Sequence, residues 1–151
     1  MDYAELNAQL RALVDGVPYG IANLANASAL LYSTMDRLNW AGFYEAREDR
    51  LVLGPFQGLP ACIVIPMGRG VCGTAAKENR TLVVPNVHEF AGHIACDAAS
   101  NSEIVVPISV GGRVAFVLDL DSPEFARFGE EDRKGLEEFA SIIGEALSVS
   151  E

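Results

Sequence analysis

The chain has 151 residues; half of them are apolar and 21% are charged, a balance typical of one folded globular domain and unlike a disordered or fibrous chain. Its 21 acidic and 11 basic side chains give a net charge of −10, which argues against nucleic acid and anionic membranes as partners, because both are themselves anionic. The N-terminus lacks the basic and apolar segments of a signal peptide, and no apolar run is long enough to span a membrane, so we expect a cytoplasmic protein with reduced thiols.

Helical patterns are expected at both ends of the chain. Asp2 and Glu5 form a capping-box pattern, and apolar residues at helical spacing follow until Gly16. A second helical pattern ends near Asp36, and residues 128–148 carry the apolar stripe of a long amphipathic helix. We therefore expect two helices before the first strand and one helix after the last.

Between these helices, short β-like runs alternate with turn residues. Strands are predicted at residues 39–44, 51–53, 62–65 and 81–84, and a short helix at 71–77. Residues 104–110 and 114–120 flank Gly111 and Gly112 as a hairpin. Residues 85–102 show little periodicity and are the best candidate for a functional loop. Helices at both ends of a mostly antiparallel sheet predict an α+β fold.

Gly68, Gly70 and Gly73 fit the G-x-G-x-x-G pattern between a predicted strand and a predicted helix. A dinucleotide-binding function needs this pattern in a βαβ unit whose next strand leads to an acidic residue. Here three strands precede the glycines, and Val84 leads into Pro85. The pattern therefore favours a tight turn and a helix start, with cofactor binding as the alternative.

The three cysteines, Cys62, Cys72 and Cys96, are spaced too widely for the close pairs of zinc sites, so no metal is expected. Free cysteines are commonly inert core residues, and Cys62 in an apolar strand fits that interpretation. Cys96 instead lies in a polar loop three residues after His93, where an exposed thiol indicates redox chemistry. A helix N-terminus lowers a thiol pKa, so local electrostatics alone favour Cys72 as the reactive thiol.

Period-two geometry groups aromatic and acidic side chains on single faces of two predicted strands. Trp40 and Tyr44 share a face of the first strand, and Gly42 leaves a gap between their rings. Asp119 and Asp121 share a face of the last strand. The other face of that strand is expected to be buried and carries Val114, Phe116, Leu118 and Leu120. Core packing of Trp40 and solvation of the aspartates are the alternatives to a site.

Five runs of residues resemble the GAF-type free methionine-R-sulfoxide reductases. They are NWAGFY at 39–44, LGPFQG at 53–58, GRGVCGTA at 68–75, GHIACDAASNSE at 92–103 and LDLDS at 118–122. The resemblance extends from about residue 20 to the C-terminus and includes all three cysteines. It implies that residues 1–151 form a single GAF domain, with a central antiparallel sheet of about six strands and with the N- and C-terminal helices packed on one side.

The same resemblance implies roles for the thiols in reducing free L-methionine-(R)-sulfoxide. Cys96 becomes the attacking thiol, Cys62 the main resolving thiol and Cys72 a secondary redox partner. The implied cycle needs no bound cofactor, since a thioredoxin-like dithiol, ultimately supplied by NADPH, reopens the disulfide. A homodimer is also implied by the family alone.

The resemblance further implies how the substrate is held. Trp40 supplies a cavity for the sulfoxide methyl group. The free ammonium group is anchored by four side chains: Tyr44, Glu103, Asp119 and Asp121. A peptide-bound sulfoxide has no ammonium group and would leave these carboxylates buried and unpaired. Asp121 is the expected proton donor to the departing oxygen, with Glu103 the next candidate.

These roles require a particular hairpin register. A regular two-residue turn at Gly111 and Gly112 would place Glu103 opposite Leu120, on the face away from Asp119 and Asp121. A three-residue loop, or a bulge near Pro107, shifts the pairing by one residue and brings the three carboxylates together. We predict the shifted register, with mutual repulsion raising at least one carboxyl pKa.

A GAF module that binds a small regulatory ligand without turnover is the alternative function. The Asn-Lys dipeptide of cyclic-nucleotide GAF domains is absent from the sequence. A sensor also has no need of three thiols, so the reductase function is favoured.

Overall fold

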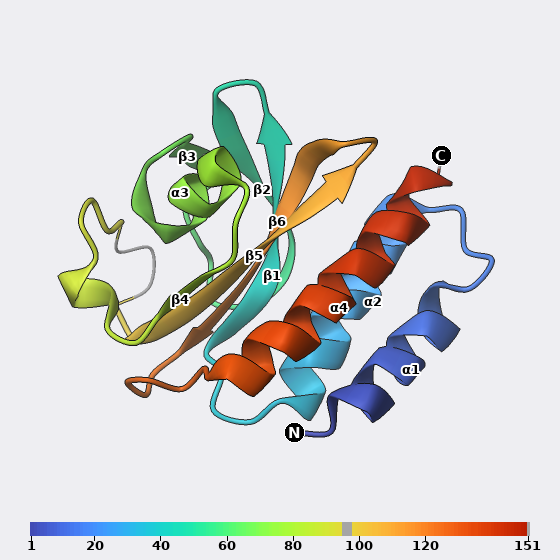
Figure 1. The fold of residues 1–151 in the computed structure, drawn as a ribbon, viewed down its shortest axis with the longest axis horizontal. Coiled ribbons are helices and arrows are strands. Elements are labelled where there is room, and N and C mark those ends of the chain that lie inside the picture. The colour runs from blue at the N-terminus through green and yellow to red at the C-terminus, as the bar shows by residue number, and fades with distance from the viewer. Residues whose placement is uncertain (95–97, 151) are drawn as a thin grey trace.

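The computed structural model describes residues 1–94 and 98–150, which contain four α-helices and a six-stranded sheet (Figure 1). The helices are α1 (Tyr3–Val14), α2 (Gly20–Thr34), α3 (Gly70–Glu78) and α4 (Glu130–Ser148). The strands are β1 (Trp40–Arg47), β2 (Arg50–Gly58), β3 (Val64–Pro66), β4 (Leu82–Val84), β5 (Ser102–Val110) and β6 (Arg113–Ser122), and a 3₁₀ turn η1 (Val87–Glu89) follows β4.

The sheet has the order β3-β2-β1-β6-β5-β4, and each neighbouring pair is antiparallel. Helices α2 and α4 cover one face, α1 packs against these two helices on the same side, and α3 lies on the other face (Figure 1). The predicted α+β architecture, its sheet of six strands and its terminal helices on one side are therefore confirmed. Among the described residues, no helix combines the length and apolar character needed to cross a membrane.

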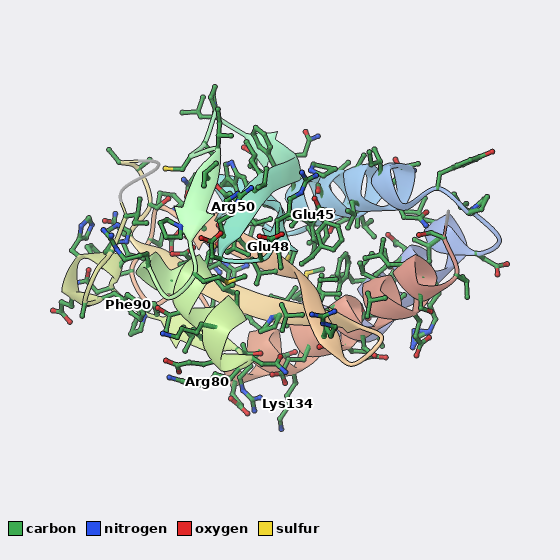
Figure 2. The ribbon with its side chains drawn as sticks, turned by 90° about the horizontal axis from the view of Figure 1, so that it is seen from above. Glu45, Glu48, Arg50, Arg80, Phe90 and Lys134 are labelled. Carbon is green, nitrogen blue, oxygen red and sulfur yellow. The ribbon has the colours of Figure 1, made fainter. Side chains whose placement is uncertain are left out.

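The sheet separates two apolar clusters, and side chains fill the layers around it (Figure 2). The helical-side cluster includes Leu6, Leu31, Phe43, Leu118, Leu136 and Phe139. The pocket-side cluster includes Trp40, Tyr44, Leu51, Val71, Val105 and Val117. Alternate residues of β1 enter different clusters because successive side chains of a strand point to opposite faces.

The β5–β6 hairpin contains one bulge. Next to the Gly-Gly turn, Ser109 pairs with Val114, but Ile108 then pairs with Phe116. Ala115 is thus an extra residue on β6, and the pairing beyond it is shifted by one position.

This bulge confirms the predicted register. Glu103 pairs with Asp121, and Val105 pairs with Asp119, so the three acidic residues occupy one face of the sheet. The turn keeps its two residues, and the shift lies between Ile108 and Ser109, next to Pro107, as one of the two predicted alternatives requires.

The bulge also corrects one predicted face. Phe116, Leu118 and Leu120 pack in or against the helical-side cluster as expected, but Val114 packs against the pocket-side cluster. The extra residue at Ala115 reverses the alternation between Val114 and the rest of the strand.

The segment before α3 also differs in detail from the prediction. Cys62 was expected within a strand, but β3 begins only at Val64 and Cys62 lies in the β2–β3 loop. The glycine pattern forms the expected turn and helix start: Gly68 and Gly70 have φ of +82° and +64°, values that glycine tolerates best. A Cβ atom at Gly73 would lie 2.5 Å from the Pro66 carbonyl oxygen, so the turn packs tightly against β3.

Candidate active site

A pocket lies on the α3 face of the sheet, and side chains from distant parts of the sequence meet in it. Six of the predicted site residues line it: Trp40, Tyr44, Cys72, Glu103, Asp119 and Asp121. The strand β1 contributes the aromatic residues, β5 and β6 the acidic ones, and α3 the thiol. Phe90, which follows η1, packs against the pocket-side cluster at the same face (Figure 2).

The three carboxylates are all buried, with Glu103, Asp119 and Asp121 only 7%, 5% and 8% exposed. The β1–β6 pairing sets Trp40 opposite Asp121 and Gly42 opposite Asp119. The Oδ1 atom of Asp119 is buried without a hydrogen-bond partner. A buried carboxylate oxygen without a partner is costly, so this position favours a ligand that carries positive charge or donates a hydrogen bond.

Burial and mutual repulsion change the acidity of these groups. The pKa of Glu103 is raised well above its ordinary value, first by burial and then by the charge of Asp119. The pKa of Asp119 is also raised, by burial and then by the charge of Asp121. The prediction that at least one carboxyl pKa is raised is therefore confirmed, and the cluster retains a proton where exposed carboxyl groups are ionised.

Cys72 lines the same pocket beside the carboxylates and is a free, buried thiol. Its Sγ atom donates a hydrogen bond to Glu103 Oε2 at 3.8 Å. Burial raises the pKa of Cys72, and the charges of Asp119 and Glu103 raise it further. The sequence-based expectation that a helix start lowers this pKa is therefore wrong, because burial beside carboxylates outweighs the helix dipole.

The other two cysteines lie in loops around the pocket. Cys62 is half-buried and disulfide-bonded, and its carbonyl oxygen accepts a 2.9 Å hydrogen bond from the Tyr44 hydroxyl. Tyr44 thus ties the β2–β3 loop to the pocket wall. Cys96, the predicted nucleophile, lies outside the described residues.

The aromatic wall of the pocket is larger than predicted. Trp40 stacks on Tyr44 and on Phe56, with ring centroids 5.9 Å and 5.1 Å apart. The Trp40 Nε1–H donates to the Leu59 carbonyl oxygen at 3.2 Å, which fixes the indole ring. A Cβ atom at Gly42 would lie 2.3 Å from Phe56 Cβ, so Gly42 admits the neighbouring strand rather than leaving an empty gap.

The sequence does not predict the contact between Asn39 and Ser100, and it indicates His93 only as a neighbour of Cys96. Asn39 Nδ2 donates to the Ser100 hydroxyl at 3.0 Å, which joins the start of β1 to the pocket-lining Ser100. His93 also lines the pocket, and burial and the neighbouring His88 lower its pKa. Asn39 and Ser100 are 61 positions apart, and no local sequence pattern reports a side-chain contact over that separation.

The pocket also contains one arrangement of metal-ligating atoms. Cys72, Glu103 and Asp119 each offer an atom, and these atoms lie within 4.8 Å of one another in the described part of the chain. Sequence spacing could not reveal this set, because its members come from α3, β5 and β6.

Comparison with known proteins identifies the family. Residues 13–148 match the GAF domain model. The free methionine-R-sulfoxide reductase of Escherichia coli is 51% identical over 149 residues, which cover 99% of this chain and 90% of that protein. The solved structure of the reduced fRMsr of Staphylococcus aureus superposes with a TM-score of 0.95 at 50% identity, covering 97% of this chain and 96% of that one.

A further solved structure contains a ligand. The free methionine-R-sulfoxide reductase of Neisseria meningitidis in complex with its substrate superposes with a TM-score of 0.95 at 43% identity, covering 98% of this chain and 89% of that one. The fold, the pocket and these similarities agree. The chain belongs to the GAF-domain free methionine-R-sulfoxide reductases.

Proposed function

We propose that this protein reduces free L-methionine-(R)-sulfoxide to L-methionine, with residues 1–151 acting as a single GAF domain. The observation that carries the proposal is the meeting of Glu103, Asp119 and Asp121 in a buried pocket beside the Trp40 ring. An ammonium group would supply the charge and the hydrogen bonds that the unpartnered Asp119 oxygen needs. The Trp40 ring offers an apolar surface to the sulfoxide methyl group.

In the proposed reaction, the Cys96 thiolate attacks the sulfoxide sulfur while a neutral carboxyl group, Asp121 or its partner Glu103, donates a proton to the sulfoxide oxygen. The sulfur–oxygen bond of the substrate breaks, the oxygen forms a bond to the Cys96 sulfur, and methionine leaves, so that Cys96 becomes a sulfenic acid. One proton balances this step, because the negative charge of the thiolate passes to the carboxyl group, which regains a proton from solvent before the next turnover. The substrate sulfur is reduced by two electrons and the Cys96 sulfur is oxidised by two.

A resolving thiol then completes the cycle. The Cys62 thiol attacks the sulfenic acid, water leaves, and a disulfide forms between Cys62 and Cys96. The disulfide-bonded state of Cys62 supports this role. Cys72, a buried thiol with a raised pKa, is suited to a secondary role, because little of it is thiolate near neutral pH.

An external dithiol of the thioredoxin class reopens that disulfide by exchange, with NADPH as the ultimate electron source. The half-buried Cys62 is flanked by exposed apolar side chains, which supports docking of a protein reductant at this loop: Leu59, Ile63 and Val64. A cycle that depends on this reductant belongs in the reducing cytoplasm. The family resemblance also implies a homodimer, which sedimentation would measure.

The acidic pocket accounts for selectivity between free and peptide-bound sulfoxide. A peptide bond replaces the ammonium group with a neutral amide, so binding would bury the carboxylates without a cationic partner. Breaking one side of a buried charge pair costs about 3–5 kcal/mol, equivalent to at least a hundredfold in affinity.

A thioredoxin-coupled assay of NADPH oxidation tests the proposed function. The free R epimer should support oxidation, whereas the free S epimer and a peptide-bound sulfoxide should give negligible rates. Equal rates on the two epimers would contradict the shaped methyl pocket. Saturable binding of the R epimer without any methionine formed would instead indicate a regulatory GAF module.

A further inference from the structure

The cluster of Cys72, Glu103 and Asp119 has the dimensions of a metal site. Their ligand atoms lie within 4.8 Å of one another, and Cys72 Sγ is 3.8 Å from Glu103 Oε2. Bonds of about 2.3 Å from zinc to sulfur and about 2.0 Å from zinc to oxygen, at tetrahedral angles, require the two ligand atoms to be about 3.5 Å apart. Cys72 Sγ and Glu103 Oε2 would therefore need to approach each other by only a few tenths of an ångström to bind the same ion.

A second, independent observation points to a bound cation. Asp119 is 5% exposed, and its buried Oδ1 atom has no hydrogen-bond partner, although Asp119 lines the pocket. Within residues 1–94 and 98–150, neither Asp119 nor Glu103 forms an ion pair with a basic side chain. These two carboxylates thus have no ion-pair partner among those residues, and Arg69, the basic side chain that also lines the pocket, is exposed.

We propose that Cys72, Glu103 and Asp119 bind a thiophilic divalent cation, for which Zn²⁺ is the representative, in the pocket. One sulfur and two carboxylate oxygens suit a borderline-soft cation, whereas Mg²⁺ and Ca²⁺ prefer oxygen ligands alone. Binding displaces the proton of the Cys72 thiol, and any carboxyl proton, into solvent; no electron is transferred. With three protein ligands, the fourth position of a tetrahedral ion faces the pocket.

The bound ion would compete with the amino-acid substrate. This consequence rests on the proposed function, in which Glu103 and Asp119 hold the substrate ammonium group. A cation that occupies both carboxylates removes that anchor, so the ion acts as an inhibitor of the reduced enzyme.

Co²⁺ is the probe for the site, because it substitutes for Zn²⁺ and reports thiolate coordination by a charge-transfer absorption band. The full chain is reduced, freed of reductant under argon and titrated with Co²⁺. We expect the band to saturate at one equivalent and to disappear when Zn²⁺ is added. Absence of the band at one equivalent overturns the proposal.

Variants identify the ligands. Cys72→Ser should abolish the charge-transfer band, and Asp119→Asn should weaken Co²⁺ binding by at least about tenfold, the lower limit for loss of even an outer partner of a metal site. Cys62→Ser and Cys96→Ser are the matched controls and should retain the band. A band that survives Cys72→Ser in a folded protein, as judged by circular dichroism, contradicts the assignment; if that variant does not fold, Asp119→Asn decides.

A competition experiment separates this proposal from the proposed function. Free methionine should raise the apparent dissociation constant for Co²⁺ when both ligands use Asp119. Co²⁺ binding that methionine leaves unchanged supports the metal site and contradicts the proposed position of the ammonium group. Turnover of the sulfoxide by a protein that fails to bind Co²⁺ contradicts the metal site alone.

Discussion

Asp121 and Glu103 face each other across β5 and β6, and the proposed reaction takes the proton for the departing oxygen from one of these carboxyl groups. Replacing Asp121 with Asn keeps the shape of the side chain but removes the acid. General acid catalysis contributes about 10²–10⁴-fold, so the first-turnover rate should fall by at least about a hundredfold, with a much smaller change in substrate affinity. Rapid-quench measurement of methionine formed in one turnover checks this.

The matched variant for that measurement is Asp119→Asn. As an ammonium anchor, Asp119 should affect binding more than the chemical step. An Asp121→Asn enzyme with an unchanged single-turnover rate contradicts the assignment of the donor. A selective loss of rate in Glu103→Gln would transfer the role to the opposite strand.

The thiols can be separated by the same single-turnover measurement. Cys96→Ser should release no methionine, because a hydroxyl is a poor nucleophile towards sulfur and cannot become a sulfenic acid. Cys62→Ser should still release one equivalent, while recycling by thioredoxin slows or passes to Cys72. Stoichiometric methionine from the Cys96→Ser protein would show that another group attacks.

At the level of the strand, Ala115 is the extra residue that shifts the β5–β6 pairing. Deleting Ala115 should remove the bulge and leave Glu103 opposite Asp121. Without Ala115, the pairs on either side of the bulge join into one regular ladder that ends in the two-residue turn. We expect this deletion variant to fold and to retain the first turnover.

Deletion of Val117 is the contrasting variant. Its loss can be absorbed by closing the bulge, which keeps Glu103 opposite Asp121 but turns Phe116 away from the helical-side cluster and puts Ala115 in its place. This variant should therefore be less stable than the Ala115 deletion, as measured by thermal denaturation. Similar behaviour of the two deletions would contradict the described register.

The sequence predicts some features of the strands and loops correctly and others not. The alternation of Trp40 and Phe43 is local, and it correctly predicted the two faces of β1. A three-residue loop or a bulge near Pro107 is predicted only because three carboxylates have to share a ligand; turn geometry alone gives the opposite face for Glu103, and the sequence does not indicate Ala115 as the extra residue. The β2–β3 loop around Cys62 was read as a strand, because its apolar residues resemble one.

Contacts between distant segments lay beyond a single-sequence analysis. The stacking of Phe56 on Trp40 and the hydrogen bond from Asn39 to Ser100 depend on which strands and loops become neighbours. The pKa of Cys72 was misjudged for the same reason. The helix start is visible in the sequence, but burial against Asp119 and Glu103 follows only from the assembled sheet.

For the molecule as a whole, the acidic pocket makes stability depend on pH. Folding raises the pKa values of Glu103 and Asp119 above their ordinary values of 4.5 and 3.8, so the native chain keeps protons that the unfolded chain releases. These two carboxyl groups contribute most to the free energy of unfolding at pH values below their ordinary pKa values. That contribution is lost as the pH rises through their higher pKa values in the folded protein. The free energy of unfolding should therefore fall with rising pH across that interval.

Urea denaturation at several pH values measures this slope. The double variant Glu103→Gln/Asp119→Asn carries no titrating group at either position, so its unfolding free energy should depend less on pH. General charge repulsion acts in both the unchanged protein, with its net charge of −10, and the double variant. The difference between their two pH slopes therefore reports the contribution of Glu103 and Asp119. Equal slopes would contradict the raised pKa values.

The separation of the apolar clusters by the sheet has a consequence for how this protein can change over evolutionary time. In the part of the chain that the structure describes, the helical-side cluster, with Leu136 and Phe139, shares no side chain with the cluster around Trp40 and Tyr44. Substitutions that improve the packing under α4 thus raise the free energy of unfolding without altering the shape of the pocket. They can offset the loss of stability that comes from burying the pocket carboxylates. Stabilising substitutions in the helical layer therefore provide a reserve of stability that a change of substrate preference on the opposite face would draw on.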